Sequence, residues 1–459
     1  MDPTTPVTTG VVFWGVWMHG IGQVGTMLYT DHTRTYNVLF YPAPTMQQYT
    51  YVIIGGGIAG TTAAETIRKS GGTGPIAIVS DESHVCYSRV LLSKPGWVLG
   101  EQPFDNVWLK NDEWYEENGI HLFKGLSAVT LDADRKVVTL SDGDELQYDK
   151  LLLATGAHNR MWNVPGADKQ GIHYLRTVDD ARAIGEVAQG EPKHVVMVGS
   201  ACVSFEIIEI LHSRGFTITE VMREKYFFEP QLSQEGVAPI ERTLEEKGVT
   251  IIRETEVAEV LGDEHVEGIR LADGTEIACD IILPFIGVEL PVDWLKAAGI
   301  ATHKGIYANQ YLETNAPDVW TAGDTAECWD LALGEAVIMG NWMSARLQGE
   351  IAGKNMVGPA RTAFEQVSFH TSHGFGYLIG WTGDVRPLPD RTIVHIPIEN
   401  DEQDHCRILV RNGRIVGGTT VNRPDLMSTI TKLIKARVDV TSSLQGLGEG
   451  SVDIKSLVP

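Results

Sequence analysis

The chain has 459 residues, of which 43% are apolar and 21% charged, and its formal net charge is −23. A chain of this length is expected to form about two or three domains, each with its own core. The negative charge argues against nucleic acid as a partner. The five cysteines have no regular spacing, which predicts a reducing, cytoplasmic environment without a disulfide framework. We expect no metal site, and we expect Cys86 and Cys328 to be small buried thiols.

Residues 1–48 differ from the rest of the chain. Positions 10–29 carry no charge and include Trp14 and Trp17. Interspersed glycines, His19 and the absence of any basic residue before this stretch argue against a membrane span. We interpret residues 1–48 as an N-terminal extension or the result of an upstream start, since Met46 lies five residues before the first predicted strand. The alternatives are an arm packed at an interface and contact with a membrane.

The most informative motif follows an apolar strand at residues 51–54. It reads G-G-G-I-A-G at residues 55–60 and leads into a helical stretch at 61–69. In this fingerprint Gly55 makes the tight turn, Gly57 lets the backbone approach a pyrophosphate, and Gly60 packs the helix against the strand. The helix N-terminus adds free N–H groups and a positive dipole end for the phosphates. The motif predicts one bound dinucleotide.

Two further strands belong to this first unit. The strand at 76–79 precedes Asp81-Glu82, where an acid would reach the ribose of an adenosine. The strand at 148–153 ends in the tight turn Ala154-Thr155-Gly156. Both patterns are typical of a parallel nucleotide-binding sheet.

A second copy of the fingerprint is damaged. The strand at 195–198 leads into G-S-A-C-V-S at residues 199–204, a helix near 205–214 and a strand at 217–222. Ala201 stands where a glycine would approach the pyrophosphate, and Ser204 stands at the helix-packing position. The pattern therefore leaves open whether a second dinucleotide binds.

The last part of the chain continues with short elements. A strand at 281–286 ends at Gly287, and a strand from Val319 ends in Ala322-Gly323-Asp324 before a helix at 341–356. After Gly358, strands are predicted at 392–397, 407–410 and 414–419 and a helix at 427–436.

The four motifs G-G-G-I-A-G, A-T-G, G-x-A-x-x-S and A-G-D occur in the order found in flavoprotein reductases with two dinucleotide domains. The segment from Asp81 to Lys94, which contains Tyr87-Ser88-Arg89, resembles one branch of the FAD-dependent pyridine nucleotide-disulfide oxidoreductase superfamily. That branch comprises the ferredoxin, rubredoxin and putidaredoxin reductases. The flavin domains of nitrite reductase large subunits and apoptosis-inducing factor are similar. The resemblance covers about residues 49–440.

This resemblance implies an α/β fold with two Rossmann-like dinucleotide-binding domains and a C-terminal α+β interface domain. The FAD-binding domain is expected to be discontinuous, with residues 49–158 as its first part and 288–358 as its second. Residues 159–287 would form the NAD(P)-binding-like domain between them, and residues 359–459 the interface domain.

The resemblance also implies the residues that hold FAD. Arg89 would lie near the phosphate or ribityl side of the flavin, and Asp324 would bind a ribityl hydroxyl. The N-terminus of the helix at 341–356 would face the pyrimidine ring, where it stabilises negative charge on reduced flavin. The complete implied set is Gly55, Gly57, Ile58, Ala59, Gly60, Asp81, Glu82, Arg89, Lys94, Ala154, Thr155, Gly156, Gly323, Asp324 and Trp342.

Three residues are implied around the reacting atoms. Lys94 and Glu206 match a lysine and a glutamate near flavin N5, where the pair would neutralise each other's charge. Trp342 matches an aromatic residue that shields the isoalloxazine face.

The implied NAD(P) site consists of Gly199, Ala201, Ser204, Arg223 and Gly287. Met222 stands where NAD-dependent members have an acid, and Arg223 could instead pair with a 2′-phosphate. This tilts the expected preference from NADH toward NADPH, unless Arg223 is only a solvent-facing charge.

Two functions are therefore weighed. The first is an FAD-dependent oxidoreductase that takes hydride from NAD(P)H and passes electrons to a small acidic ferredoxin- or rubredoxin-type carrier. The second is a flavoprotein electron-transfer subunit with a degenerate nicotinamide site, which exchanges electrons only with protein partners. A homodimer or a larger redox complex is an expectation for either function. A candidate landing site for the carrier is a basic cluster made of Arg407, Arg411, Arg414, Arg423, Lys432, Lys435 and Arg437.

Overall fold

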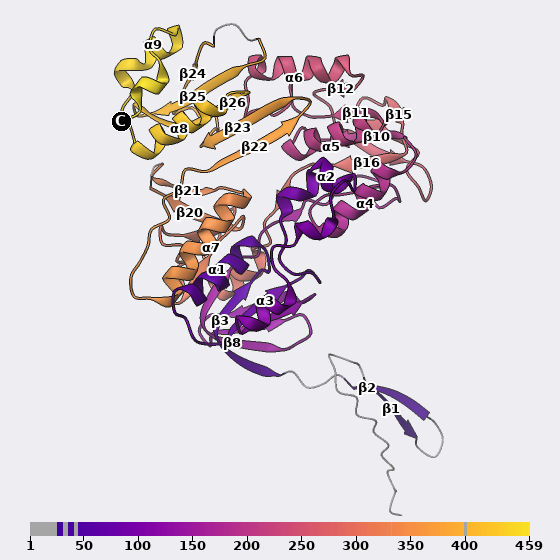
Figure 1. Cartoon of the computed structure of the whole chain (residues 1–459). Coiled ribbons are helices and arrows are strands. Elements are labelled where there is room, and N and C mark those ends of the chain that lie inside the picture. Colours follow the sequence, from indigo (N-terminus) through magenta and orange to yellow (C-terminus); the bar gives the residue numbers. More distant parts are fainter. Residues whose placement is uncertain (1–24, 31–34, 41–44, 332, 399–401) are drawn as a thin grey trace, which may run out of the picture.

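The computed structural model describes residues 25–30, 35–40, 45–331, 333–398 and 402–459. Its first unit is a sheet of seven strands in the order β5-β4-β3-β8-β7-β6, with β19 also paired to β8. Strands β6 and β7 are antiparallel to their neighbours and the other pairs are parallel. The bounds are β3 Met46–Ile54, β4 Ile76–Ser80, β5 Ile120–Lys124, β6 Ala128–Asp132, β7 Val137–Leu140, β8 Glu145–Leu153 and β19 Val319–Thr321. Residues on both sides of the second dinucleotide motif thus build one sheet (Figure 1).

Two helices pack on this sheet, α1 (Ile58–Lys69) and α7 (Trp342–Val357). Their backbones come into direct contact where they cross. A Cβ added at Gly349 would lie 2.2 Å from the carbonyl oxygen of Ala59, and one at Gly353 would lie 2.6 Å from that of Ala63. Only glycine allows this approach. The other helices of this part are η1 Arg89–Ser93, α2 Pro95–Val98, η2 Phe104–Val107 and α3 Asp112–Glu117.

The second unit is a parallel sheet in the order β12-β11-β10-β16. Its strands are mostly buried and mostly apolar, with Thr219 and Glu220 of β11 as buried polar residues. One face packs against helices and the other against a small antiparallel sheet. The helix α5 begins three residues before the predicted start at 205. The bounds are α4 Val178–Gln189, β10 His194–Val198, α5 Cys202–Ser213, β11 Thr217–Val221, α6 Gln234–Glu246, β12 Thr250–Ile252 and β16 Ile281–Pro284. A small antiparallel sheet joins β13 Val257–Leu261, β14 Gly268–Leu271 and β15 Glu276–Ala278.

The chain enters and leaves this second unit side by side. The two-residue strand β9 (His158–Asn159) pairs antiparallel with β17 (Val288–Glu289). After β17 come η3 Asp293–Ala298, β18 Ile306–Ala308, β20 Ala326–Asp330 and β21 Glu335–Ile338, with the sheet order β18-β20-β21.

The C-terminal part is a five-stranded antiparallel sheet in the order β22-β23-β26-β25-β24, against which α8 packs. This is the expected α+β arrangement. Strands β22 and β23 were not predicted, because β22 has no apolar alternation. The bounds are β22 Phe369–Gly374, β23 Tyr377–Gly383, β24 Thr392–His395, β25 His405–Arg411, β26 Arg414–Val421, α8 Pro424–Ala436, η4 Thr441–Ser443, α9 Leu444–Glu449 and η5 Ile454–Leu457.

The N-terminal extension contains a hairpin of β1 (Gly25–Thr30) and β2 (Thr35–Phe40). The prediction that Met46 precedes the first strand of the sheet is wrong, because β3 begins at Met46 and pairs with β8 from that residue. Most of the uncharged stretch at 10–29 lies outside the described residues. Among those described, no helix has the length and apolar character needed to cross a membrane.

The helix crossing yields a stability prediction. We expect Gly349→Ala to destabilise the protein by about 1–3 kcal/mol, the usual cost of overpacking, although alanine favours a helix by about 1 kcal/mol over glycine. The measurement is the midpoint of thermal unfolding. The matched control is Gly358→Ala at the end of the same helix, where the nearest atom to an added Cβ is 3.8 Å away. Equal midpoints for the two variants would contradict the prediction.

Candidate functional site

Three sequence motifs meet at the first glycine turn. Gly55 has φ +121°, and a Cβ there would lie 2.0 Å from the carbonyl oxygen of Ala154. A Cβ at Gly60 would lie 2.0 Å from the carbonyl oxygen of Gly55. Gly323 lies against Ala59, whose Cβ would be 3.2 Å from a Cβ added at Gly323. Gly55 and Gly60 require glycine because backbone approaches backbone, and Gly323 favours it because its φ is +88°.

Gly57 is different, because a Cβ added there would meet no protein atom within 4 Å. Its φ of −74° and ψ of −169° are open to any residue. Among the described residues, nothing therefore demands glycine at the N-cap of α1. Free space at this position, in front of a helix N-terminus, fits a bound pyrophosphate.

The A-G-D turn lies next to the start of α7. The backbone N–H of Gly323 donates to Gln348 Oε1 at 2.8 Å, and Asp324 Oδ2 lies 3.0 Å from Arg176 Nη2. Asn341 caps α7 by accepting from the Ser344 N–H at 2.9 Å. Trp342, the first residue of the helix, has a buried indole N–H with no partner among the described residues. A ligand atom at this helix end would supply the missing acceptor.

The two acids after β4 differ in how closely their carboxylates are paired with other side chains. Glu82 accepts from the Tyr87 hydroxyl at 2.5 Å and pairs with Arg89. Arg89 also donates to the carbonyl oxygen of Arg176 at 2.6 Å. Asp81 is exposed, and its contact is His158, at 3.9 Å. Asp81 is thus the acid with room to reach a ribose, and Glu82 positions Arg89.

The buried carboxylate of Glu206 accepts hydrogen bonds from the first unit and from the C-terminal part. Glu206 on α5 is 6% exposed and lies 2.7 Å from Lys94 Nζ. It also accepts from the hydroxyl of Ser93 at 2.5 Å and from that of Ser372 on β22 at 3.0 Å. The structure therefore brings the predicted Lys94–Glu206 pair together. The sequence did not predict the roles of Ser93 and Ser372. No sequence pattern marks a serine that donates to a carboxylate far away in the chain.

The second glycine turn opens onto a cavity of about 480 Å³ that Gly199, Ala201, Arg223 and Gly287 help to line. Gly199 has φ +102°, and a Cβ there would lie 2.5 Å from the carbonyl oxygen of Phe285. Ala201 has φ −83° and ψ 163°, nearly the conformation of Gly57. The alanine fits its backbone without strain, and its methyl group is exposed. Among the described residues none clashes with the methyl group of Ala201, so a clash could arise only with a bound ligand.

Ser204 and Glu220 form a second buried pair beneath this turn. The Ser204 hydroxyl donates to Glu220 Oε2 at 2.9 Å, and both residues are completely buried. Glu220 Oε1 has no hydrogen-bond partner among the described residues. Burial raises the pKa of Glu220 well above its ordinary value. The serine at the third glycine position is thus accommodated by a carboxyl group that the sequence did not indicate.

The end of the cavity near β11 carries charges of both signs. Met222 is 1% exposed and belongs to the core. Arg223 lines the cavity with Glu224, Glu229 and Glu256, and its Nη1 lies 3.7 Å from Glu256 Oε1. These carboxylates weaken the basis of the expected preference for NADPH, since a 2′-phosphate would meet acids as well as Arg223.

Comparisons with known proteins decide the family. The model of the pyridine nucleotide-disulphide oxidoreductase family matches residues 49–349. The chain belongs to this family. A biphenyl dioxygenase system ferredoxin–NAD(+) reductase component from Paraburkholderia xenovorans (strain LB400) is 30% identical over 411 residues, which are 89% of this chain and 99% of the relative.

Two further similarities are informative. A nitrite reductase [NAD(P)H] from Bacillus subtilis (strain 168) is 27% identical over 85% of this chain, which spans about half (48%) of that relative's length. The solved structure of the covalent putidaredoxin reductase–putidaredoxin complex has a TM-score of 0.81 at 24% identity, over 89% of this chain and 97% of the matched chain. The latter likeness shows the fold.

The disulphide in the family name has no counterpart here, because all five cysteines are free. Burial raises the pKa of the Cys86 thiol to about 11 and that of Cys328 to about 12. Both thiols are buried, as the sequence predicted.

The basic cluster predicted between residues 407 and 437 is not a single exposed surface. Arg407 is 3% exposed and donates to the carbonyl oxygens of Pro230 and Gln231 at 2.7 and 2.6 Å. Arg411 and Arg423 are held in ion pairs, with Asp390 and Asp425 among their partners. The prediction is wrong for these three residues, because sequence proximity does not reveal local acids or burial. Arg414, Lys432, Lys435 and Arg437 are exposed.

The Ser204–Glu220 pair yields a prediction about pH. The pKa of Glu220 is higher in the folded protein than in the unfolded chain, where it is near 4.3. The contribution of protonated Glu220 to the free energy of unfolding is therefore fully present below about pH 4.3. It is then lost as pH rises toward the folded pKa, at about 1.4 kcal/mol per pH unit. Glu220→Gln keeps an acceptor for Ser204 but cannot ionise. We expect its thermal midpoint to exceed that of the wild type by a margin that grows between pH 5 and 8.

The control is Glu246→Gln on α6, an exposed acid. Its midpoint should follow the wild type at every pH. A constant difference between Glu220→Gln and the wild type across this range would contradict the assignment.

Proposed function

We propose that the protein is an FAD-dependent reductase that takes hydride from NAD(P)H and passes electrons to a small ferredoxin- or rubredoxin-type carrier. The observation that carries this proposal is the Lys94–Glu206 pair. It links the residue that follows η1, in the first dinucleotide unit, to α5, the helix that starts at the second glycine turn. The resemblance to a ferredoxin–NAD(+) reductase component supports the choice of carrier.

The residues fit FAD at the first turn. Gly57 and the N-terminus of α1 would hold the pyrophosphate, Asp81 the adenosine ribose, and Asp324 the ribityl chain. When bound, FAD accepts two electrons with a hydride and can release them one at a time. We propose the same domain limits as above: FAD-binding parts at 49–158 and 288–358, the NAD(P) domain at 159–287, the interface domain at 359–459 and the extension at 1–48. A cytoplasmic location is part of this proposal.

The chain's own groups would prepare the reacting region. Glu206 is buried, so its charge must be compensated, and Lys94, Ser93 and Ser372 together supply three donors. This fixes the Lys94 ammonium next to the start of α5. The N-terminus of α7 would place a positive dipole end beside reduced flavin. These groups orient and tune, and the proposal assigns none of them a proton transfer.

A second function is favoured by one observation, Ala201. If its methyl group prevents nicotinamide nucleotides from binding, the protein is an electron-transfer subunit that exchanges electrons only with protein partners. Anaerobic addition of NADH or NADPH decides between the two. Bleaching of the flavin absorbance is the result expected for the reductase. No bleaching at about millimolar nucleotide would establish the electron-transfer subunit instead.

The first prediction concerns flavin retention. We expect the purified protein to contain one FAD per chain and no FMN, and Gly57→Val to abolish FAD retention. Because no atom of the described part of the chain lies within 4 Å of an added Cβ, the variant should keep its far-ultraviolet circular dichroism. Gly358→Val is the matched control and should keep its flavin. Recovery of a fully flavinated Gly57→Val protein would remove the basis for placing FAD at this turn.

A second prediction concerns the effect of Ala201 on the affinity for nicotinamide nucleotides. Overpacking by one methyl group costs about 1–3 kcal/mol, which corresponds to a roughly 5- to 150-fold loss of affinity. We therefore expect Ala201→Gly to tighten NADH binding within this range without altering flavin content. Ala201→Ser, which keeps a Cβ, should not. Equal dissociation constants for the wild type and Ala201→Gly would show that the methyl group is accommodated.

A third prediction concerns the choice between nucleotides. We expect the wild type to use NADH at least as well as NADPH, because Glu256 pairs with Arg223 and Glu224 and Glu229 line the same cavity. Glu256→Gln should raise the ratio of kcat/KM for NADPH to that for NADH about three- to tenfold, as expected for one unit charge several ångströms away. Glu259→Gln, outside this cavity, is the control. An unchanged ratio in Glu256→Gln would exclude Arg223 as a phosphate ligand.

A further inference from the structure

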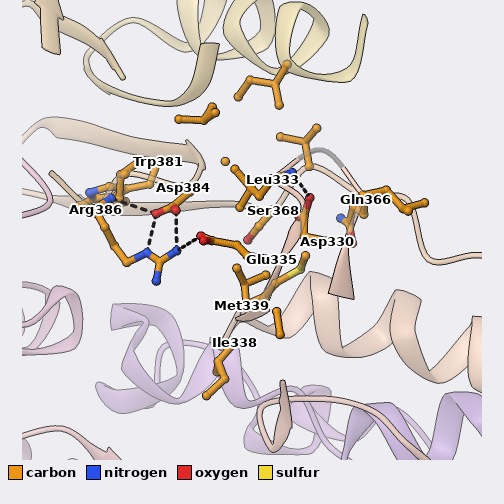
Figure 2. Close-up of a pocket in the computed structure, with 18 of the residues that line it drawn as sticks. Asp330, Leu333, Glu335, Ile338, Met339, Gln366, Ser368, Trp381, Asp384 and Arg386 are labelled. Carbon is orange, nitrogen blue, oxygen red and sulfur yellow. Dashed lines mark hydrogen bonds and ion pairs between the residues drawn. The ribbon is translucent and has the colours of Figure 1, made fainter. Parts of the chain in front are cut away.

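A second cavity, of about 620 Å³, lies between the β20–β21 hairpin and the C-terminal part. Figure 2 shows Leu333 and Met339 of the hairpin region facing Trp381 and Asp384 across it. Of the residues assigned above to FAD, none is among those that line this cavity. Its volume is in the range of small-molecule sites, about 300–1,000 Å³. Its apolar walls include Leu333, Val337, Met339, Phe364, Val385 and Ile434.

An aromatic pair closes one side of this cavity. His370 on β22 and Trp381 on β23 are direct partners in the sheet, and their rings stack at 4.6 Å with an angle of 13°. His370 is exposed, whereas Trp381 is 1% exposed. Both residues and Gln231 also line the cavity at the second glycine turn. The outer face of the imidazole is therefore available to a flat ring.

Four of the acids that line the cavity are held in ion pairs or hydrogen bonds. Asp384 pairs with Arg386 at 2.6 Å, and Arg386 lies 2.9 Å from Glu335 (Figure 2). Glu327 lies 2.9 Å from the imidazole of His303. Asp330 accepts from the Leu333 N–H. Within the described part of the chain, Glu365 is the lining acid that has no such partner.

Three cations in the lining are free. Lys304, Lys435 and Arg437 are exposed and have no ion-pair partner among the described residues. Lys304 precedes β18, and the other two residues lie at the end of α8. They place three positive charges at the cavity in a chain whose net charge is −23. We call these three residues the cationic rim.

We propose that this cavity is a binding site for a planar aromatic anion. The apolar walls and the His370–Trp381 pair would hold the ring, because flat rings bury much area and stack favourably. The cationic rim would neutralise the charge of the ligand. Gln231, His370 and Trp381 also line the cavity at the second glycine turn, and the proposed site shares no other residue with the proposed FAD and nucleotide sites. The proposal therefore stands or falls separately from the reductase function.

The test is isothermal titration of the flavin-containing protein, without nucleotide, with two anthraquinones. Anthraquinone-2-sulfonate is planar and anionic, and 2-(hydroxymethyl)anthraquinone is its neutral counterpart. We expect the sulfonate to bind with a dissociation constant below about 100 μM, more tightly than the neutral compound. Lys435→Gln should weaken sulfonate binding about three- to tenfold, consistent with the loss of one nearby charge, and change the neutral compound less than twofold.

The matched control is Lys432→Gln, which makes the same change on α8 at an exposed lysine outside the cavity. It should leave both affinities unchanged. His370→Ala should weaken both compounds several-fold, because it removes the ring contact that they share. Flavin absorbance checks that each variant retains its cofactor.

Two results would overturn the proposal. One is the absence of binding by the sulfonate at about 1 mM. The other is an equal loss in Lys432→Gln and Lys435→Gln, which would show that the overall charge of the protein and not this cavity attracts the anion. Both results are independent of whether NADH bleaches the flavin.

Discussion

The structure depends above all on the compensation of one buried charge. Glu206 is 6% exposed, and a carboxylate in that environment is tolerated only when donors surround it. Its donors come from η1 and the residue after it and from β22, while Glu206 itself is on α5. One side chain thereby fixes the relative positions of three segments that are far apart in sequence. Loss of any single donor would leave a buried charge short of a partner, which is more costly than the loss of a surface ion pair.

Close backbone contact is the second constraint. At Gly55, Gly60 and Gly349 an added Cβ would lie 2.0–2.2 Å from a carbonyl oxygen. These contacts bring the first turn, the A-T-G turn and α7 together around one region. Gly57 has no such contact and is free of any demand from the protein itself. The same fingerprint thus contains glycines that serve folding and one whose surroundings are left open for a ligand.

Sequence reasoning succeeded where the signal is local. The strands before each glycine turn, the order of the motifs and the α+β character of the C-terminal part follow from patterns within about ten residues. It failed where a residue's role depends on distant partners. Glu220 and Ser372 gave no signal, since their meaning comes from Ser204 and Glu206. Arg407 was counted as a surface charge, but its guanidinium donates to carbonyl groups at Pro230 and Gln231. Strand β22 was not predicted because its sequence, FHTSHG, lacks the alternation of apolar and polar residues that indicates a strand.

The paired strands β9 and β17 have a consequence for how such a chain can change. Asn159 lies opposite Val288, so the two ends of the segment between them are neighbours, about 5 Å apart as in any antiparallel pair. The segment is thus a cassette with adjoining ends. Its removal or replacement would leave a gap that a turn of a few residues can close, at little cost in loop entropy. A replacement would have to supply the carboxylate of Glu206, because Ser93, Lys94 and Ser372, which lie outside the cassette, all donate to it.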